Sequence, residues 1–193
     1  MKKLLFINAC IRKNSRTEEL AGRYLEKLKD EYQIEEVRLA DLNIKPFDAE
    51  TLSKRDSDTA HGKLDSESYR LAHQFAEADL IVIAAPYWDC LFPSIVRVYL
   101  EHVCVAGITF AYSESGSLVK TCRADKMVYI TTCGGFLPEH PAVEAWIREM
   151  GNLFSIRDVR FYAAEGLDVA PDQVPEILDR VLEKMTGGNH ENK

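Results

Sequence analysis

Hydroxyl and guanidinium side chains gather in residues 10–17, directly after the first apolar run of the chain. The hydroxyls of Ser15 and Thr17 and the guanidinium of Arg12 can each donate hydrogen bonds to an anion. The spacing Ser15-x-x-Glu18 predicts a capping box at a helix start, where free backbone N–H groups and the helix dipole also favour negative charge. This hydroxyl segment (residues 10–17) therefore predicts a phosphate site. The alternative is a capped helix start that binds nothing.

A second segment, the aromatic segment (residues 86–93), places two aromatic residues between prolines. Tyr87 and Trp88 lie between Pro86 and Pro93, and the prolines favour a stiff, extended backbone. Such a segment can direct backbone amides at a planar heterocycle while an aromatic side chain covers one face of the ring. The alternative is that both aromatic residues belong to the core.

A third segment, the glycine segment (residues 131–136), contains the consecutive glycines Gly134 and Gly135. Glycine accepts positive φ and allows the backbone to approach a planar ring closely. The sequence contains neither G-x-x-x-x-G-K-[ST] nor G-x-G-x-x-G. A P-loop nucleotidase and an ordinary dinucleotide-binding domain are therefore disfavoured.

The elements that must position these segments follow from the apolar pattern. Continuous apolar runs at residues 3–9, 80–85 and 127–131 predict strands that are buried on both faces of a parallel sheet. Weaker strand patterns occupy residues 33–38 and 157–163. Apolar residues at helical spacing predict the intervening and final helices around residues 20–28, 71–76, 95–103, 143–150 and 174–185.

The strict alternation of strand and helix predicts an α/β fold, an open parallel sheet with helices on both faces. Ligands bind such sheets beyond the carboxyl ends of the strands, where the strand order reverses. The hydroxyl, aromatic and glycine segments follow the first, third and fourth of the five predicted strands. We therefore expect the three segments to lie together at the carboxyl ends of these strands. Two segments interrupt the alternation: residues 49–67, expected to be a mobile excursion, and residues 105–125, too long for a simple turn.

Length and composition limit the remaining possibilities. The 193 residues, 46% hydrophobic and 28% charged, predict a single domain over residues 1–186 with a frayed tail at 187–193. A net charge of −7 disfavours nucleic acid and anionic membrane surfaces as partners. The apolar run at the N-terminus is too short for a signal peptide, and no run is long enough to cross a membrane. We therefore expect a soluble, cytoplasmic protein.

Five cysteines occur without any C-x-x-C spacing, which predicts reduced thiols rather than a disulfide framework or a zinc ribbon. Cys10, Cys90 and Cys133 all follow predicted strands. A three-thiol metal site is the alternative, but small buried cysteines are common. We expect no bound metal.

A phosphate site, an aromatic wall and a glycine edge at three neighbouring strand ends are what FMN needs. The run Pro86-Tyr87-Trp88-Asp89 with Pro93-Ser94, the segment Gly107-Ile108-Thr109-Phe110-Ala111-Tyr112 and the run Thr131-Thr132-Cys133-Gly134-Gly135 resemble the FMN-dependent NAD(P)H:quinone oxidoreductase and azoreductase family. The similarity spans roughly residues 3–165. It implies a flavodoxin-like three-layer sandwich with a five-stranded parallel sheet of order 2-1-3-4-5.

The resemblance also implies roles for individual residues. Ser15, Arg16 and Thr17 would hold the phosphate of FMN, residues 86–90 would line the isoalloxazine ring, and residues 132–135 would contact its pyrimidine side. Family members are typically homodimers with the active site at the subunit interface, where Tyr112 would reach the substrate pocket. The expected cofactor-binding residues are Cys10, Arg12, Ser15, Arg16, Thr17, Pro86, Tyr87, Trp88, Asp89, Cys90, Thr132, Cys133, Gly134 and Gly135.

The chain departs from the family pattern at several of these positions. Cys10 replaces a small hydroxyl residue, Asp89 the usual Asn, Cys90 an aromatic residue, and Leu137 a His. We expect Asp89 to lie beside the flavin, where its charge disfavours added electrons; the alternatives are that it points to solvent or caps the following helix at Pro93. No catalytic residue is assigned, although His140 and Tyr112 are candidates for supplying a proton to the acceptor.

The expected activity is a two-electron, ping-pong hydride transfer from NAD(P)H through FMN to a planar quinone-like or azo acceptor. The cofactor carries this chemistry, so no protein nucleophile is needed. Two alternatives remain: an electron carrier like flavodoxin, without substrate turnover of its own, and a flavin-binding sensor whose thiols respond to oxidants.

Overall fold

A five-stranded parallel sheet forms the centre of the protein in a computed structural model that describes residues 1–187. The strand order is β2-β1-β3-β6-β7, with every neighbouring pair parallel. Numbered among these five strands alone, the order is 2-1-3-4-5, which confirms the predicted flavodoxin-like topology. The strands are β1 (Lys2–Asn8), β2 (Tyr32–Arg38), β3 (Leu80–Ala84), β6 (Lys126–Thr132) and β7 (Asp158–Ala164).

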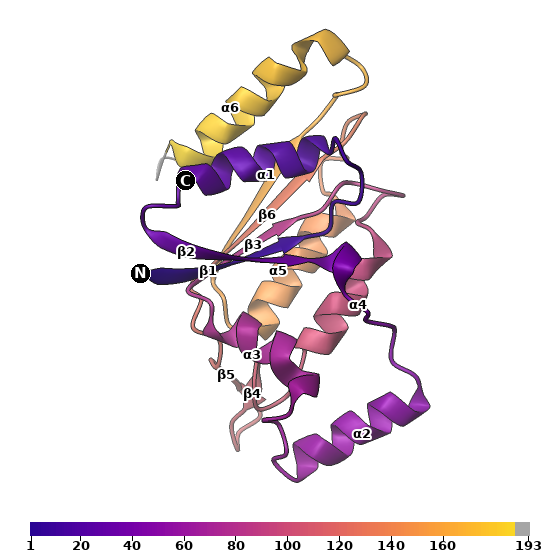
Figure 1. Cartoon of the computed structure of the whole chain (residues 1–193), viewed down its shortest axis with the longest axis vertical. Coiled ribbons are helices and arrows are strands. Elements are labelled where there is room, and N and C mark those ends of the chain that lie inside the picture. The colour runs from indigo at the N-terminus through magenta and orange to yellow at the C-terminus, as the bar shows by residue number, and fades with distance from the viewer. Residues whose placement is uncertain (188–193) are drawn as a thin grey trace.

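Helices cover both faces of this sheet (Figure 1). Side chains of β1 alternate between the two faces: Leu4 and Phe6 pack with one layer of helices, and Leu5 and Ile7 with the other. The first layer contains α1 (Arg16–Glu26) and α6 (Val174–Thr186). The second contains α3 (Arg70–Glu77), α4 (Ser94–Val103) and α5 (Ala142–Leu153).

Residues 49–67, expected to be a mobile excursion, contain a helix that the sequence analysis did not predict: α2 (Ala49–Ala60) occupies twelve residues of this stretch. A capping box starts the helix: Thr51 N–H donates to the Asp48 carboxylate at 2.8 Å, and Asp48 N–H donates to the Thr51 hydroxyl at 3.0 Å. No α2 side chain is buried, and the helix stands away from the sheet (Figure 1). The missing apolar face explains why hydrophobic periodicity did not reveal it.

Residues 105–125 contain a short antiparallel hairpin, β4 (Ala111–Tyr112) and β5 (Leu118–Val119). The chain then enters β6, so the hairpin lies at the amino-terminal end of the sheet. A buried Thr109 hydroxyl fixes its base by donating to the carbonyl oxygen of Val103 at 2.7 Å. The long connection is therefore an ordered element.

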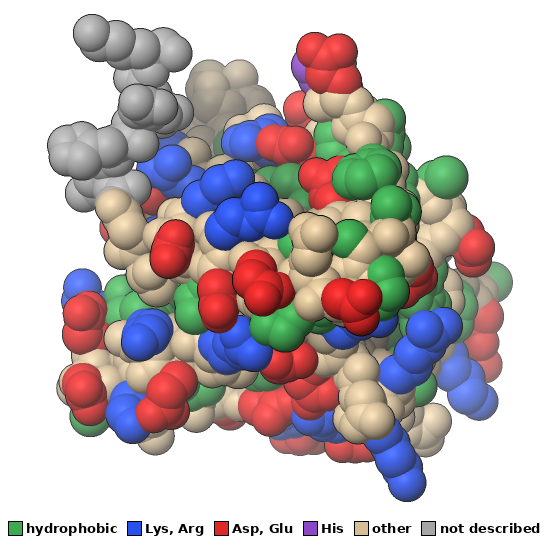
Figure 2. Space-filling view, turned by 90° about the horizontal axis from the view of Figure 1, so that it is seen from above, with side chains coloured by type: hydrophobic (Ala, Val, Ile, Leu, Met, Phe, Trp, Pro, Cys, Tyr) green, Lys and Arg blue, Asp and Glu red, His purple; other side chains and the backbone are tan. Residues whose placement is uncertain are grey.

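The described part of the chain ends just after α6. Gly187 follows the helix, and the remaining residues of the expected frayed tail, 188–193, lie outside the described part. None of the helices within residues 1–187 is long and apolar enough to cross a membrane. Figure 2 shows basic and acidic side chains interspersed over the face formed by α1 and α6, without a continuous basic patch.

Candidate functional site

A pocket of about 420 Å³ lies at the carboxyl ends of β1, β3 and β6. We call it the strand-end pocket. Its volume is within the range of small-molecule and cofactor sites. The pocket draws on all three segments singled out in the sequence and on the loop after β7. It is lined by Ile11, Arg12, Asn14, Ser15, Arg16, Thr17, Pro86, Tyr87, Trp88, Thr132, Cys133, Gly134, Leu167 and Asp168.

The hydroxyl segment leads into α1, whose N-cap is Ser15. The Ser15 hydroxyl accepts a hydrogen bond from Glu18 N–H at 3.3 Å. The predicted capping box is only half formed, because the Glu18 carboxylate turns away from Ser15 and bonds the Asn8 amide at 3.1 Å and the Arg38 guanidinium. The bond with Arg38 lowers the pKa of Glu18. Glu18 thus ties α1 to β1 and β2.

A buried pair of hydroxyls connects α1 with the glycine segment. Thr17 Oγ1 and Thr132 Oγ1 lie 2.7 Å apart, and the two residues are 1% and 8% exposed. This bond fixes the first turn of α1 against the end of β6. The backbone N–H groups at the start of α1 therefore have a defined orientation at the pocket.

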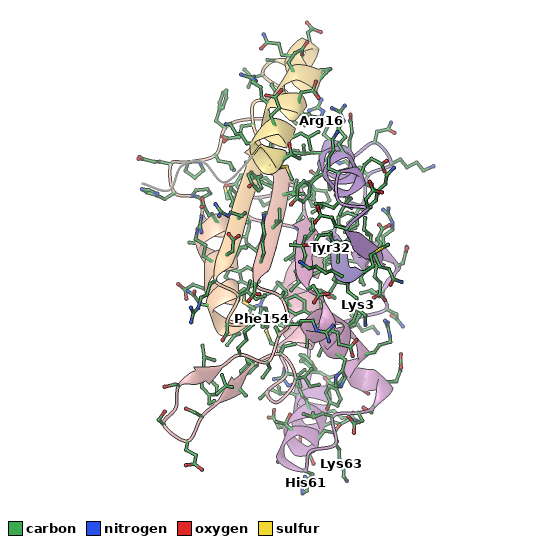
Figure 3. All side chains as sticks on the ribbon, turned by 90° about the vertical axis from the view of Figure 1, so that its left-hand side faces the viewer. Lys3, Arg16, Tyr32, His61, Lys63 and Phe154 are labelled. Carbon is green, nitrogen blue, oxygen red and sulfur yellow. The ribbon has the colours of Figure 1, made fainter. Side chains whose placement is uncertain are left out.

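The loop after β7 forms the third side of the pocket by pairing with the glycine segment. Leu167 N–H donates to the carbonyl oxygen of Cys133 at 3.2 Å, and Asp168 N–H to that of Gly134 at 3.0 Å. The Asp168 carboxylate also accepts a hydrogen bond from Arg16 at 2.7 Å. Figure 3 shows Arg16 where α1 begins, beside α6.

The aromatic segment supplies a rigid wall. Tyr87 N–H donates to the carbonyl oxygen of Thr132 at 3.1 Å, which fixes the segment to β6. Trp88 and Leu91 exchange backbone hydrogen bonds of 3.3 and 2.8 Å around a tight turn. The guanidinium of Arg12 lies 5.7 Å from the centre of the Trp88 ring system, a cation–π geometry. Arg12 is thus at the mouth of the pocket.

Asp89 and Cys90 form the corner of that turn, with φ of 48° and 66°. Both are exposed and neither lines the strand-end pocket. Asp89 does not cap α4, whose N-cap is Pro93 without a side-chain hydrogen bond. The cap alternative is therefore wrong, whereas the alternative that Asp89 points to solvent agrees with its exposure. The carboxylate that lines the pocket belongs to Asp168.

The thiols near the pocket are held as neutral groups. Cys10 and Cys133 are 2% and 8% exposed, and burial raises the pKa of each to about 11. Cys133 Sγ donates to the carbonyl oxygen of Gly135 at 3.1 Å. Cys90, by contrast, is exposed. Within residues 1–187, no group of three or more His, Cys, Asp or Glu residues is placed to hold a metal ion.

Ten of the fourteen expected cofactor-binding residues line the pocket; Cys10, Asp89, Cys90 and Gly135 do not. The proton-donor candidates also lie outside it: His140 is exposed before α5, and Tyr112 is 60% exposed on the hairpin. Sequence reasoning missed Ile11, Asn14, Leu167 and Asp168 as lining residues. The first two lie inside the hydroxyl segment and could have been included, whereas Leu167 and Asp168 reach the pocket only through pairing of β7 with β6.

Comparison with known proteins extends these observations. A family model described as flavodoxin-like fold matches residues 2–187. The chain is 34% identical to FMN-dependent NADH:quinone oxidoreductase 2 of Clostridium acetobutylicum, covering 95% of this chain and 96% of that protein. It is also 34% identical to FMN-dependent NADH:quinone oxidoreductase of Clostridium beijerinckii, with the same two coverages of 95% and 96%.

Solved structures agree on the fold. An azoreductase from Bacillus anthracis Sterne superimposes with a TM-score of 0.82 at 22% identity, covering 97% of this chain and 98% of that one. An FMN-dependent NADH-azoreductase from Bacillus anthracis Ames Ancestor, solved in complex with FMN, gives 0.78 at 24% identity, covering 97% and 99%. These matches confirm the family resemblance expected from the motifs: the chain belongs to the flavodoxin-like family that includes the FMN-dependent NADH:quinone oxidoreductases.

Proposed function

We propose that this protein is an FMN-dependent oxidoreductase that uses NADH to reduce a planar quinone-like or azo acceptor. The observation that carries the proposal is the strand-end pocket, which joins a helix N-terminus, an aromatic wall and a glycine edge in one cavity. The printed names of the relatives, NADH:quinone oxidoreductase and NADH-azoreductase, support the donor and the acceptor class. Family, fold and pocket chemistry thus favour the same reaction.

The residues present suit FMN. Ser15, Arg16 and Thr17 stand at the N-terminus of α1, where hydroxyl, guanidinium and backbone N–H donors match a phosphate. Pro86 and Trp88 offer a stiff wall with an aromatic face, and Gly134 lines the pocket without a side chain of its own. The bound flavin would supply the two-electron chemistry, accepting hydride from NADH and passing it to an acceptor in a separate binding event.

The protein's own groups bind, orient and exclude water. The backbone hydrogen bond from Tyr87 to Thr132 fixes the position of the aromatic segment relative to the end of β6. Ile11 and Leu167 add apolar surface at the pocket, which keeps water from the reacting centre. The arginines Arg12 and Arg16 provide positive charge in a chain of net charge −7.

A second copy of the chain completes the pocket in this proposal. The β4–β5 hairpin, with exposed Tyr112 and Leu118, lies at the end of the molecule opposite Arg16 (Figure 3). Next to the strand-end pocket, Ile11 and Phe136 are also exposed. A two-fold dimer that sets each hairpin against the partner's pocket would bury both apolar groups and bring Tyr112 to the acceptor. This arrangement gives a site enclosed by two copies.

The two alternative functions make different demands. A thiol sensor needs reactive thiolates, but burial raises the pKa of Cys10 and Cys133, so both stay protonated near neutral pH. The exposed Cys90 is then the thiol at this end of the sheet on which a sensor would depend. An electron carrier needs a partner protein to turn over, whereas the proposed enzyme needs only NADH and an acceptor.

The absence of disulfides among the five cysteines supports a cytoplasmic location.

The test is reconstitution followed by turnover. Protein incubated with excess FMN and desalted should retain about one flavin per chain, should bleach on anaerobic addition of NADH, and should regain its colour when a quinone is added.

Arg16→Ala should weaken FMN binding by about tenfold or more. The matched control is Arg23→Ala, because Arg23 also lies on α1 but bonds Asp179. Protein that retains no flavin refutes the proposal, and flavoprotein that needs a partner protein favours the carrier.

A further inference from the structure

Asp168 connects two walls of the strand-end pocket. Its Oδ1 accepts a hydrogen bond from Nη1 of Arg16 at 2.7 Å, and its backbone N–H donates to the carbonyl oxygen of Gly134 at 3.0 Å. A carboxylate therefore lies between the N-terminus of α1 and the glycine segment, where the donors for a phosphate converge.

The carboxylate fits there because residue 134 is a glycine. A Cβ built on Gly134 would overlap the Asp168 carboxylate, whereas a Cβ on Gly135 would meet nothing within 4 Å. Gly134 is not among the glycines with positive φ, so its backbone does not require glycine. A side chain at position 134 would therefore require the Asp168 carboxylate to move away from its present place beside Arg16.

Asp168 offers Arg16 the same acceptor chemistry as a phosphate oxygen. Carboxylate and phosphate both bind the planar donors of a guanidinium, and two anions at one cation repel each other. The Asp168 side chain is 74% exposed and that of Arg16 38%, so this ion pair is solvated and weak enough for a phosphate to compete with it. Arg16 has no other carboxylate within 4 Å in the described residues.

We propose that Asp168 is a built-in competitor for the cofactor phosphate. This inference rests on the proposed function, since it concerns the phosphate of FMN. While the pocket is empty, Asp168 holds Arg16 at the start of α1. When the phosphate arrives, it must share Arg16 with Asp168 or displace it, so the affinity for FMN is lower, and its release faster, than the other donors alone would give.

The test compares FMN with riboflavin, which lacks the phosphate. Flavin fluorescence titration and stopped-flow release are measured for the wild-type protein and for Asp168→Asn, which keeps the shape and removes the charge. Asp168→Asn should tighten FMN binding by about threefold or more, slow its release, and leave riboflavin affinity unchanged.

The matched control is Asp179→Asn, because Asp179 also bonds an α1 arginine, Arg23 at 2.8 Å, but on α6 and away from the pocket. This variant should change neither flavin's affinity. Unchanged or weaker FMN binding in Asp168→Asn, or equal tightening of FMN and riboflavin, overturns the inference. A wild-type protein that binds no FMN fails the proposed function instead, so the two failures are distinguishable.

Discussion

The Thr17 and Thr132 hydroxyls share a buried hydrogen bond of 2.7 Å that joins the first turn of α1 to the end of β6. Thr17→Val keeps the side-chain shape but leaves the Thr132 hydroxyl without this partner. We expect the free energy of unfolding to fall by about 1–2 kcal/mol, measured by urea denaturation.

Two further variants test this hydroxyl pair. Thr186→Val, at an exposed position near the end of α6, should change stability by less than about 0.5 kcal/mol. The double variant Thr17→Val with Thr132→Val should recover part of the loss, because no buried hydroxyl then lacks a partner. A double variant that loses the sum of the two single effects would contradict this account.

Glu18 makes stability depend on pH at the acid end. Hydrogen bonding to Arg38 lowers its pKa from 4.5 in the folded protein, so its contribution is present above pH 4.5 and is lost as the pH falls through the folded-state pKa. Glu18→Gln should lower the free energy of unfolding by about 1 kcal/mol at pH 7, and by less at an acidic pH below the folded-state pKa of Glu18. Urea denaturation of the wild-type protein and the variant at these two pH values measures the difference. Glu26→Gln, in an exposed pair with Lys29, should show no comparable effect at pH 7.

Two helical glycines should respond to alanine with opposite signs. A Cβ on Gly22 meets nothing within 4 Å, so Gly22→Ala should raise the free energy of unfolding by about 0.5–1 kcal/mol through helix propensity. A Cβ on Gly151 would overlap Val159 where α5 packs on β7, so Gly151→Ala should lower it by about 1–3 kcal/mol. Thermal unfolding of the two variants and the wild-type protein measures both changes in stability. If Gly151→Ala is stabilised like Gly22→Ala, then α5 does not pack closely on β7 at this position.

The hairpin residue Tyr112 tests the proposed dimer. Because Tyr112 is 60% exposed in one chain, Tyr112→Ala should leave thermal stability of the isolated chain nearly unchanged. The variant should dissociate more readily, which light scattering detects as a mass below that of two chains. It should also have a higher KM for the acceptor, whereas the amount of FMN retained after desalting should not change. Glu114→Ala, also exposed on this hairpin, is the control. A wild-type protein that is monomeric and fully active would exclude the shared site.

The turn at Asp89 and Cys90 carries local strain. Cys90 has a φ of 66° without being glycine, which is unfavourable for a side chain with a Cβ. Cys90→Gly should therefore raise the free energy of unfolding by about 0.5–1 kcal/mol in denaturant titrations. Cys104→Gly, in the region after α4 where φ is −70°, should instead be destabilising. A loss of stability in Cys90→Gly would mean that the turn is not strained.

The sheet could be predicted from sequence because its signal is local. The apolar run that forms β3 is buried at all five positions, and five consecutive apolar residues in the sequence predict this continuous burial. The edge strand β2 was a weaker prediction, since its burial alternates and several of its residues are exposed. The alternation of strands and helices predicted a parallel sheet, whereas the strand order came from the family resemblance and not from the pattern along the chain.

What sequence could not supply depends on contacts between distant residues. Glu18 has the right spacing for a capping box, but Arg38 lies close enough in space to take its carboxylate. Asp168 reaches Arg16 across 152 positions of sequence, and no spacing rule connects the two. Similarly, α2 has no buried side chain, so its only local signal was the pair Asp48 and Thr51.

The absence of buried side chains in α2 also affects how the sequence can change over evolution. Substitutions in β3 alter packing on both faces of the sheet, so few are tolerated. In α2, by contrast, most side chains are exposed, and contacts to the rest of the fold come from a few residues such as Asp58, which accepts a hydrogen bond from Tyr69 at 2.8 Å. Substitutions at the exposed positions of α2 should therefore be tolerated more readily than substitutions in β3, so sequences descended from this chain should diverge more in this helix than in the central strand.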